Sequence, residues 1–420
     1  MSLLMVPRVD LISVSKLPRW KLVNRNLPSP NSTTDRKPLQ FFKQVRGSHV
    51  FFLSAVANRD RPNKGDTNVI ISAMDGAGIT LTCCIIINGD RLFSTPAQLF
   101  SEHYNIDFMP KITQYFYPAH FASKQFLCVV PGNRSVTNVS LTSSKCSDNV
   151  GDYVPVIYPQ SVLGGLAICA KTAFEKGPVP ERFVEWVEIQ RLLGVDKILL
   201  FNLGVPEKLE QVFRFYHNLG ILDIVPYELP GVIQGVPVRG LSLERQVKPQ
   251  FSHDENLPVY ECRERLAGYT YVAGIDLDEI ILPHRNQGLK QFMEDYLKRF
   301  PDAAGFLFHV QFHVTSWGRH AHHDVFFLDY QRSTPPRWEC EKYIYLPERT
   351  HLAHTHSFEA KPSFRSYSLS RDAAIIHHYR TCPLGWATCF PEIIIDKEML
   401  RFSSVLQQKL KRVHKYLGWA

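Results

Sequence analysis

The pattern of apolar and polar positions divides the chain into three regions. Residues 1–47 are polar and interrupted by proline, which predicts a loose stem or linker. Residues 48–158 contain short apolar runs separated by Gly, Asn and Pro, which predicts a small β-rich domain. From residue 159 to 420, apolar strand-like runs alternate with segments of helical periodicity, and a terminal helix follows. We therefore expect a second, α/β domain over 159–420.

The α/β region begins with a regular alternation of elements. The run at 164–170 predicts a strand, and the helix after it should begin at Pro180 and end at Gly194. The same alternation then continues with a strand at 197–202, a helix at 206–220 and a strand at 221–229. Strands and helices that alternate through short loops are typical of a mostly parallel sheet with crossover helices on its faces.

The next apolar run, YVAGIDLDEIILP at 271–283, predicts one central strand that carries three carboxylates. On a strand, Asp276 and Asp278 project to one side and Glu279 to the other. Ligands of open α/β sheets bind at the carboxyl ends of strands. A hard cation, Mg²⁺ or Mn²⁺, would relieve the repulsion between the two aspartates and still offer open positions to phosphate oxygens. The alternative is a buried acid pair bonded to backbone amides or arginine.

Charge and cysteine content narrow the possible functions. The net charge of +8 is spread along the chain, which suits an anionic small ligand and is not typical of nucleic-acid binding. None of the nine cysteines forms a CxxC pair, which argues against a zinc ribbon.

Glycosylation sequons at Asn31, Asn133 and Asn138 favour a secretory lumen. Short spacing suggests two disulfides, Cys128 with Cys146 and Cys382 with Cys389. We find no apolar run of about 20 residues that could span a membrane.

Four sequence blocks, in order, resemble glycosyltransferase family 92. They are VPERFVEWVEIQRLLGVDKILLFN, YTYVAGIDLDEIILP, KYIYLPERTHLAHTH and AAIIHHYR, and VFFLSAVANRDRP upstream is also similar to that family. The resemblance implies a GT-A fold, a Rossmann-like nucleotide-sugar domain with flanking helices. It also implies an inverting galactosyltransferase that uses UDP-galactose and Mn²⁺ on a glycan of a glycoprotein or glycolipid. Members are usually anchored in Golgi membranes.

The resemblance also assigns site residues. Asp276 and Asp278 match the metal-binding D-x-D motif; Asp278 would bind the metal directly, and Asp276 would bind it directly or through water, or would contact the ribose. Glu279 would brace the loop. A histidine often completes such a site, and our order of preference is His378, His356, His377. Expected donor contacts are Lys171 and Asn202 for uracil or ribose, and Arg182 and Arg380 for the diphosphate; Asp324 and Glu341 are candidates for the catalytic base.

Two other functions stay open at this stage. A haloacid-dehalogenase-type phosphatase also uses D-x-D after an apolar strand, with the first aspartate as nucleophile. A catalytically inactive glycan-binding protein could share the glycosyltransferase fold. Relatives commonly place an aromatic residue after the third acid, where this chain has Ile280 and Ile281, so the donor and acceptor need independent tests.

Overall fold

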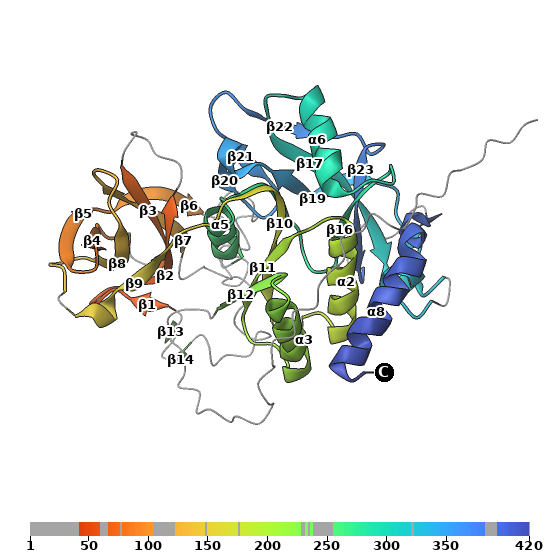
Figure 1. Cartoon of the computed structure of the whole chain (residues 1–420), viewed down its shortest axis with the longest axis horizontal. Coiled ribbons are helices and arrows are strands. Elements are labelled where there is room, and N and C mark those ends of the chain that lie inside the picture. Colours follow the sequence, from red (N-terminus) through yellow and green to blue (C-terminus); the bar gives the residue numbers. More distant parts are fainter. Residues whose placement is uncertain are drawn as a thin grey trace, which may run out of the picture. The chain divides into compact units, whose positions relative to one another are not determined.

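The computed structural model describes most of the chain after residue 41 (Figure 1). The described residues are 42–58, 66–75, 78–103, 122–147, 149–174, 177–227, 232–233, 236–237, 255–320, 323–382 and 393–419. Nearly all of the predicted stem, Asn31 and Cys389 lie outside these ranges. By their contacts, residues 41–420 form one unit, so the boundary that we predict at 158/159 stays a prediction.

The first sheet has nine strands and is mainly antiparallel. Its order is β5-β4-β8-β9-β2-β3-β7-β6, with β1 beside β2 and a parallel pairing of β2 with β9. The strands are β1 (Lys43–Gln44), β2 (Val50–Asn58), β3 (Thr67–Asp75), β4 (Thr82–Ile87), β5 (Arg91–Pro96), β6 (Gln98–His103), β7 (Ala122–Val130), β8 (Val136–Thr142) and β9 (Val154–Ile157). A separate core of buried aliphatic side chains lies along these strands. The 3₁₀ turn η2 (Val150–Asp152) precedes β9.

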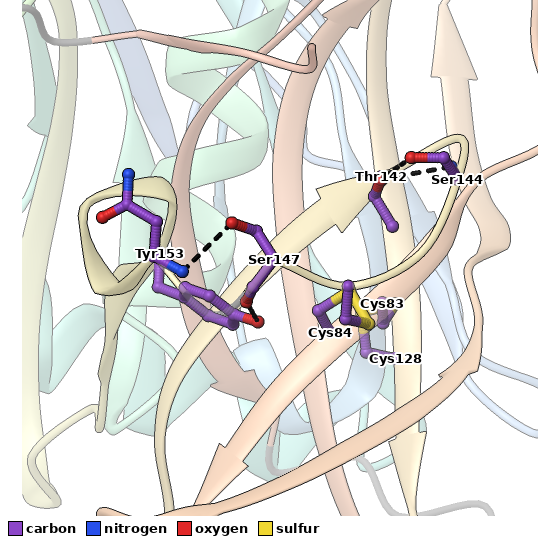
Figure 2. Close-up of a disulfide and its surroundings, with 9 residues drawn as sticks. Cys83, Cys84, Cys128, Thr142, Ser144, Ser147 and Tyr153 are labelled. Atoms are coloured by element: carbon purple, nitrogen blue, oxygen red, sulfur yellow. Dashed lines mark hydrogen bonds between the residues drawn. A yellow bond between two sulfur atoms is a disulfide. The ribbon is translucent and has the colours of Figure 1, made fainter.

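Two disulfides cross this sheet. Cys83 bonds to Cys128 on β7, and Cys84 bonds to Cys146 after β8. Figure 2 shows the first bond and the neighbouring loop, where the Tyr153 hydroxyl donates to the Ser147 carbonyl at 2.7 Å. The predicted pairing of Cys128 with Cys146 is wrong. Successive residues on a strand face opposite sides, so the adjacent cysteines of β4 each take a different partner.

The second sheet has eleven strands, in the order β12-β11-β10-β15-β19-β17-β18-β24. In addition, β22 and β23 pair with β17, and β16 pairs with β23. The strands are β10 (Val162–Ala173), β11 (Lys197–Asn202), β12 (Leu222–Pro226), β15 (Tyr269–Gly274), β16 (Glu279–Pro283), β17 (Ala303–Val314), β18 (Arg332–Ser333), β19 (Arg337–Tyr345), β22 (Arg365–Ser368), β23 (Ala374–Arg380) and β24 (Ile394–Ile395). Two short ladders, β13 (Val232–Ile233) with β14 (Val236–Pro237) and β20 (Thr350–Ala353) with β21 (Phe358–Ala360), lie apart from it.

The sheet is mixed rather than mostly parallel. The four strands β12, β11, β10 and β15 run parallel, as the strand–helix alternation predicts. Beyond them, β19 is antiparallel to both β15 and β17. The expectation of a mostly parallel sheet therefore fails for this half, because a buried strand has the same apolar pattern whichever way it runs.

Helices cover the second sheet, and α2 packs against both α3 and α8 (Figure 1). They are α2 (Pro180–Leu192), α3 (Glu207–Asn218), α5 (Asn256–Arg265), α6 (Leu289–Arg299), α7 (Phe326–Asp329) and α8 (Ser403–Leu417), with the 3₁₀ turns η4 (Thr315–Trp317), η5 (Pro347–Arg349) and η7 (Glu398–Phe402). As predicted, α2 begins with Pro180, whose fixed φ suits the first helical position. Phe183 and Trp186 of α2 are fully buried in the main core.

Helix α5 contacts both sheets. Its Cys262 is disulfide-bonded to Cys169 of β10, and its Glu261 accepts a hydrogen bond from Ser54 of β2 at 2.5 Å. Leu53 of β2 and Leu257 of α5 belong to one buried cluster. The helix therefore fixes the end of β10, where the cleft described below begins.

The single strand predicted over 271–283 is in fact two strands joined by a turn. β15 ends at Gly274 and β16 begins at Glu279. Between them, the Glu279 amide donates to the Asp276 carbonyl at 3.1 Å, and the Asp276 amide donates to the Glu279 carboxylate at 2.8 Å. Such local bonds offer the backbone an alternative to the ladder. The chain therefore leaves β15 and pairs next with β23.

Candidate active site

A cleft of about 740 Å³ opens beside this turn. It lies at the ends of β10, β15 and β23 and is closed on other sides by the start of α2 and by α7. Its charged lining side chains are Lys171, Arg182, Glu255, Asp276, Asp278 and Arg380, together with His378. The carboxyl ends of the parallel strands thus meet at one site, as expected for an open α/β sheet.

Asp276 lies between two buried lysines. Lys171 approaches one of its carboxylate oxygens at 2.8 Å, and Lys342 of β19 approaches the other at 2.9 Å. Burial would raise the pKa of Asp276, but the two ammonium groups hold it well below its usual range. In turn, burial would lower the pKa of Lys342, yet Asp276 and Glu279 raise it. Asp276 is therefore a fixed anion whose two oxygens are already paired.

The backbone of Lys171 adopts a rare conformation that serves this contact. Its φ is +52°, in the left-handed region, and the register of β10 against β11 shifts between Cys169 and Thr172. For a residue with a Cβ, this conformation costs about 1–2 kcal/mol. Such strain persists where the surroundings impose it, commonly at functional sites. Here the bulge accompanies the ion pair that the buried Lys171 side chain makes with Asp276.

Gly274 allows β15 and β19 to approach closely just before the turn. A Cβ at this position would lie 2.6 Å from the Tyr343 ring, well inside contact distance. The Tyr343 hydroxyl donates to the His354 carbonyl, which fixes the ring. The small residue at the end of β15 thus keeps Lys342 of β19 within reach of Asp276.

Asp278 and His378, which line the cleft, form a second group with the buried Glu279 behind them. His378 stands opposite Glu279 in the β16–β23 ladder. Its Nδ1 lies 3.2 Å from Glu279 and its Nε2 lies 3.4 Å from Asp278. Burial would lower the pKa of His378, but Glu279 and Asp278 raise it above the usual value. Burial is also the largest reason that the pKa of Glu279 is raised.

These three residues fit a divalent metal. Their ligand atoms all lie within 4.8 Å of one another. The Glu279 Oε1 and the His378 Nδ1 are buried and have no hydrogen-bond partner among the described residues. Two carboxylates and one imidazole form a donor set that suits Mn²⁺. The group differs from the predicted set, because Asp276 is paired with lysines and Glu279 takes part.

The expectation that Glu279 faces away from the aspartates is wrong. Because the chain turns between β15 and β16, the side-chain alternation of a single strand does not apply across residues 275–278. Glu279 is completely buried, and one of its oxygens does brace the turn at the Asp276 amide. Its other oxygen faces His378 and Lys342.

The predicted donor contacts divide into two groups. Lys171, Arg182 and Arg380 line the cleft, and the Arg182 guanidinium lies 4.0 Å from the centre of the Phe326 ring. Asn202 ends β11, where its side chain accepts a hydrogen bond from the Gly204 amide at 3.0 Å. It is not among the residues that line the cleft in the described part of the chain.

The alternative histidines and the two candidate bases are not among the described residues that line the cleft. His356 contacts the carbonyl of Glu341 at 3.1 Å, and burial, then Lys342 and Lys171, lower its pKa to about 4. Asp324 is exposed. Within the described ranges, neither carboxylate lines the cleft. His377 is buried on the opposite face of β23, because successive strand residues alternate.

Sequence reasoning missed Glu255 and Lys342. Glu255 precedes α5 and lines the cleft; burial raises its pKa, against the effect of Lys171. No spacing or motif singles it out. Lys342 begins the apolar run KYIYLP, and a charged residue at the edge of a buried strand is a signal that could have been used.

Comparisons with known proteins identify the family of the chain. Among protein-family models, that of glycosyltransferase family 92 matches residues 164–417, more than half of the chain. The match includes both groups of the cleft. No curated protein matches the chain. In the described part of the chain, every helix is too short or too polar to cross a membrane.

Proposed function

Because the chain belongs to glycosyltransferase family 92, we propose that it transfers galactose from UDP-galactose to a glycan, with inversion and with a divalent metal. The observation that supports this most directly is the convergence of Asp278, Glu279 and His378 at the wall of a cleft that also holds cationic side chains. A nucleoside diphosphate needs both a metal and arginine-type donors for its phosphates.

In this proposal, Asp278, Glu279 and His378 hold Mn²⁺ or Mg²⁺. The bound ion supplies Lewis-acid stabilisation of the charge that develops on the UDP leaving group. Arg182 of α2 and Arg380 of β23, which both line the cleft, contact the diphosphate. Their planar guanidinium groups can each bind two phosphate oxygens.

Asp276 has a different role from the metal ligands. Lys171 and Lys342 orient its carboxylate, and about a third of its side chain is still exposed to the cleft. A fixed carboxylate is a good acceptor for the hydroxyl groups of a ribose. Lys171, beside it, neutralises part of the acidic charge, so the cleft can accept an anionic nucleotide.

Inverting transfer also needs a base that removes the proton of the acceptor hydroxyl. Glu255 is the carboxylate best placed for this, because it lines the cleft apart from the three proposed metal ligands. Its raised pKa brings it closer to neutral pH, which favours proton transfer. Asp324 and Glu341 remain possible only if the acceptor reaches beyond the cleft.

The test is a thermal-shift titration with UDP, with and without Mn²⁺. A ligand that binds only the folded state raises the melting temperature, so we expect a shift with both together. Asp278→Asn should abolish this shift and reduce galactose transfer by at least about 100-fold, the usual cost of losing one charge-stabilising group. Asp324→Asn, an exposed carboxylate outside the cleft, is the matched control for UDP binding. Protection by a phosphomonoester and not by UDP would favour the phosphatase.

We also propose a Golgi or other secretory-lumen location. Three disulfides, Cys83–Cys128, Cys84–Cys146 and Cys169–Cys262, are typical of an oxidising compartment. Cys382 is disulfide-bonded too, and its predicted partner Cys389 lies outside the described residues. Asn133 is exposed, as a glycosylated residue must be.

Mass spectrometry of the protein from its native cells should find these disulfide bonds and a glycan. A fully reduced, unmodified chain would contradict the location.

A further inference from the structure

A second group of metal-type side chains lies on the other face of β23. His313 of β17, His377 of β23 and Asp396, just after β24, bring their ligand atoms within 4.8 Å of one another. The two imidazole rings are stacked, with centroids 4.8 Å apart. Both histidines are only 1% exposed. None of the three residues lines the cleft of the proposed transferase site.

The distances within this group are too long for hydrogen bonds and slightly longer than those between ligands of one ion. The Asp396 Oδ2 lies 3.6 Å from the His377 Nε2 and 3.9 Å from the His313 Nε2, both too long for a hydrogen bond. Zinc binds nitrogen and oxygen at about 2.0–2.2 Å, so neighbouring ligands of a tetrahedral ion lie about 3.3–3.5 Å apart. A small contraction of the group would therefore place all three around one ion.

One ligand atom in the group is buried and unsatisfied. The His313 Nε2 has no hydrogen-bond partner in the described part of the chain. Its Nδ1 lies 2.8 Å from the Tyr330 carbonyl, which can only accept, so the ring proton is on Nδ1. The Nε2 therefore presents a lone pair toward Asp396. Leaving such an atom unpaired in the interior costs about 1–3 kcal/mol, and a metal ion would satisfy it.

His313 and Asp396 have the surroundings of an outer coordination shell, whereas the His377 Nδ1 is buried without a hydrogen-bond partner among the described residues. Metal-bound histidines usually donate their other N–H to a carbonyl, as His313 does to Tyr330, and bound carboxylates accept further hydrogen bonds. The Asp396 Oδ1 accepts from the Glu398 amide at 2.7 Å, and its Oδ2 accepts from Gln311 at 2.7 Å. These bonds fix the carboxylate toward the two rings.

We propose that His313, His377 and Asp396 bind a zinc ion, separate from the metal of the transferase cleft. Two imidazoles and one carboxylate suit zinc, with water as the fourth ligand. A hollow of about 460 Å³, lined by Asp396, Gln311 and Arg401 among others, provides the entry path. Because Asp396 lies two residues before η7, which leads into α8, the ion would attach the C-terminal helical segment to β17 and β23.

The experiment measures zinc per chain in the full-length protein after zinc loading and exhaustive dialysis, in the Asp278→Asn background so that the cleft metal does not contribute. We expect one zinc per chain, and its loss in the Asp278→Asn/Asp396→Asn double variant. The matched control is the Asp278→Asn/Asp372→Asn double variant, which should keep the zinc. Asp372 is an exposed carboxylate that accepts a hydrogen bond from Ser370. Equal zinc in both double variants, or none in the Asp278→Asn protein, would overturn the proposal.

A second measurement does not depend on whether the Asp396 variant folds. Co²⁺ in place of zinc should give the intense visible absorption of a four-coordinate ion in the Asp278→Asn protein, with two nitrogen ligands by magnetic resonance. If the protein gives no more than the weak spectrum of six-coordinate aqueous Co²⁺, the group holds no ion and the proposal is wrong. Failure of UDP binding in the wild type would leave this result unchanged, so the two proposals fail separately.

Discussion

His377 and His378 are consecutive residues of β23, yet they belong to two different chemical environments. His378 faces the cleft, where Asp278 and Glu279 lie 3.4 Å and 3.2 Å from its nitrogens. His377 faces the opposite side, where the described residues offer it one carboxylate, Asp396, and a second imidazole, His313. The acids raise the pKa of His378 despite its burial, whereas burial and His313 lower the pKa of His377 to about 3, against Asp396.

The difference shows that burial alone does not set the protonation state of a histidine. Both rings are almost fully buried, and burial disfavours the charged form of each imidazole. The number of carboxylates within a few ångströms decides whether the pKa of each histidine is raised or lowered. Several carboxylates can lie together at the cleft because Lys342 and Lys171 compensate the negative charge of Asp276. The proposed zinc site contains no such lysine among the described residues, and a neutral imidazole there is already in its ligand form.

The largest effect that we expect from disturbing this contrast follows removal of Lys342. Lys342→Met leaves Asp276 and Glu279 without their buried cation, and breaking a buried ion pair costs about 3–5 kcal/mol. Because Lys171 still pairs with Asp276, we expect the lower end, about 3 kcal/mol of unfolding free energy. Chemical denaturation of the metal-free protein measures it.

Two controls sharpen this prediction. Lys197→Met removes an ion pair with the half-exposed Asp223 and should cost less than about 1 kcal/mol, as surface pairs do. The Lys342→Met/Asp276→Asn double variant removes both charges and should recover part of the loss. A Lys342→Met protein as stable as the Lys197→Met protein would show that the cleft acids are not held by this lysine.

The next effect concerns which histidine serves the cleft metal. His378→Ala should raise the Mn²⁺ concentration needed for UDP binding by at least about 10-fold, the order of loss seen when metal ligation is disturbed. His356→Ala should leave it nearly unchanged, because His356 contacts the Glu341 carbonyl outside the cleft. Titration of UDP binding against Mn²⁺ compares them side by side. A shift in the His356 variant alone would transfer the role to that residue.

The sequence predicts much of this fold because its signals are local. Pro180 starts α2 where expected, and the apolar runs at 164–170 and 197–202 lie within β10 and β11. The turn between β15 and β16 was not predictable from periodicity. It depends on bonds between Asp276 and Glu279, and these interrupt an apolar run that otherwise reads as one strand.

The site was predictable to the extent that its residues carry a motif. Asp276, Asp278 and His378 do lie together in one cleft, and so do Lys171, Arg182 and Arg380. The assignment of partners was not predictable, because it depends on contacts across the sheet. Lys342 reaches Asp276 only because β19 pairs antiparallel with β15. His377 was considered for the cleft, and the alternation of β23 places it on the other face.

The most direct comparison of the two histidines is the pH dependence of unfolding in a chelator. The folded pKa of His378 lies above its unfolded value of about 6.5, so its stabilisation is complete below pH 6.5 and is lost as the pH rises through the folded pKa. The folded pKa of His377 lies below 6.5, so its stabilisation is present above pH 6.5 and is lost on acidification toward pH 3.

The two variants should therefore diverge in opposite directions. Relative to wild type, His377→Gln should gain up to about 1.4 kcal/mol of unfolding free energy per pH unit below pH 6.5 and change little above it. The unfolding free energy of His378→Gln should instead rise relative to that of wild type as the pH rises above 6.5. Denaturant midpoints of both variants and of wild type at pH 5, 6.5 and 8, as chosen test conditions, measure the slopes. Parallel profiles for the two variants would mean that one electrostatic environment extends through β23, and the contrast between its two faces would not hold.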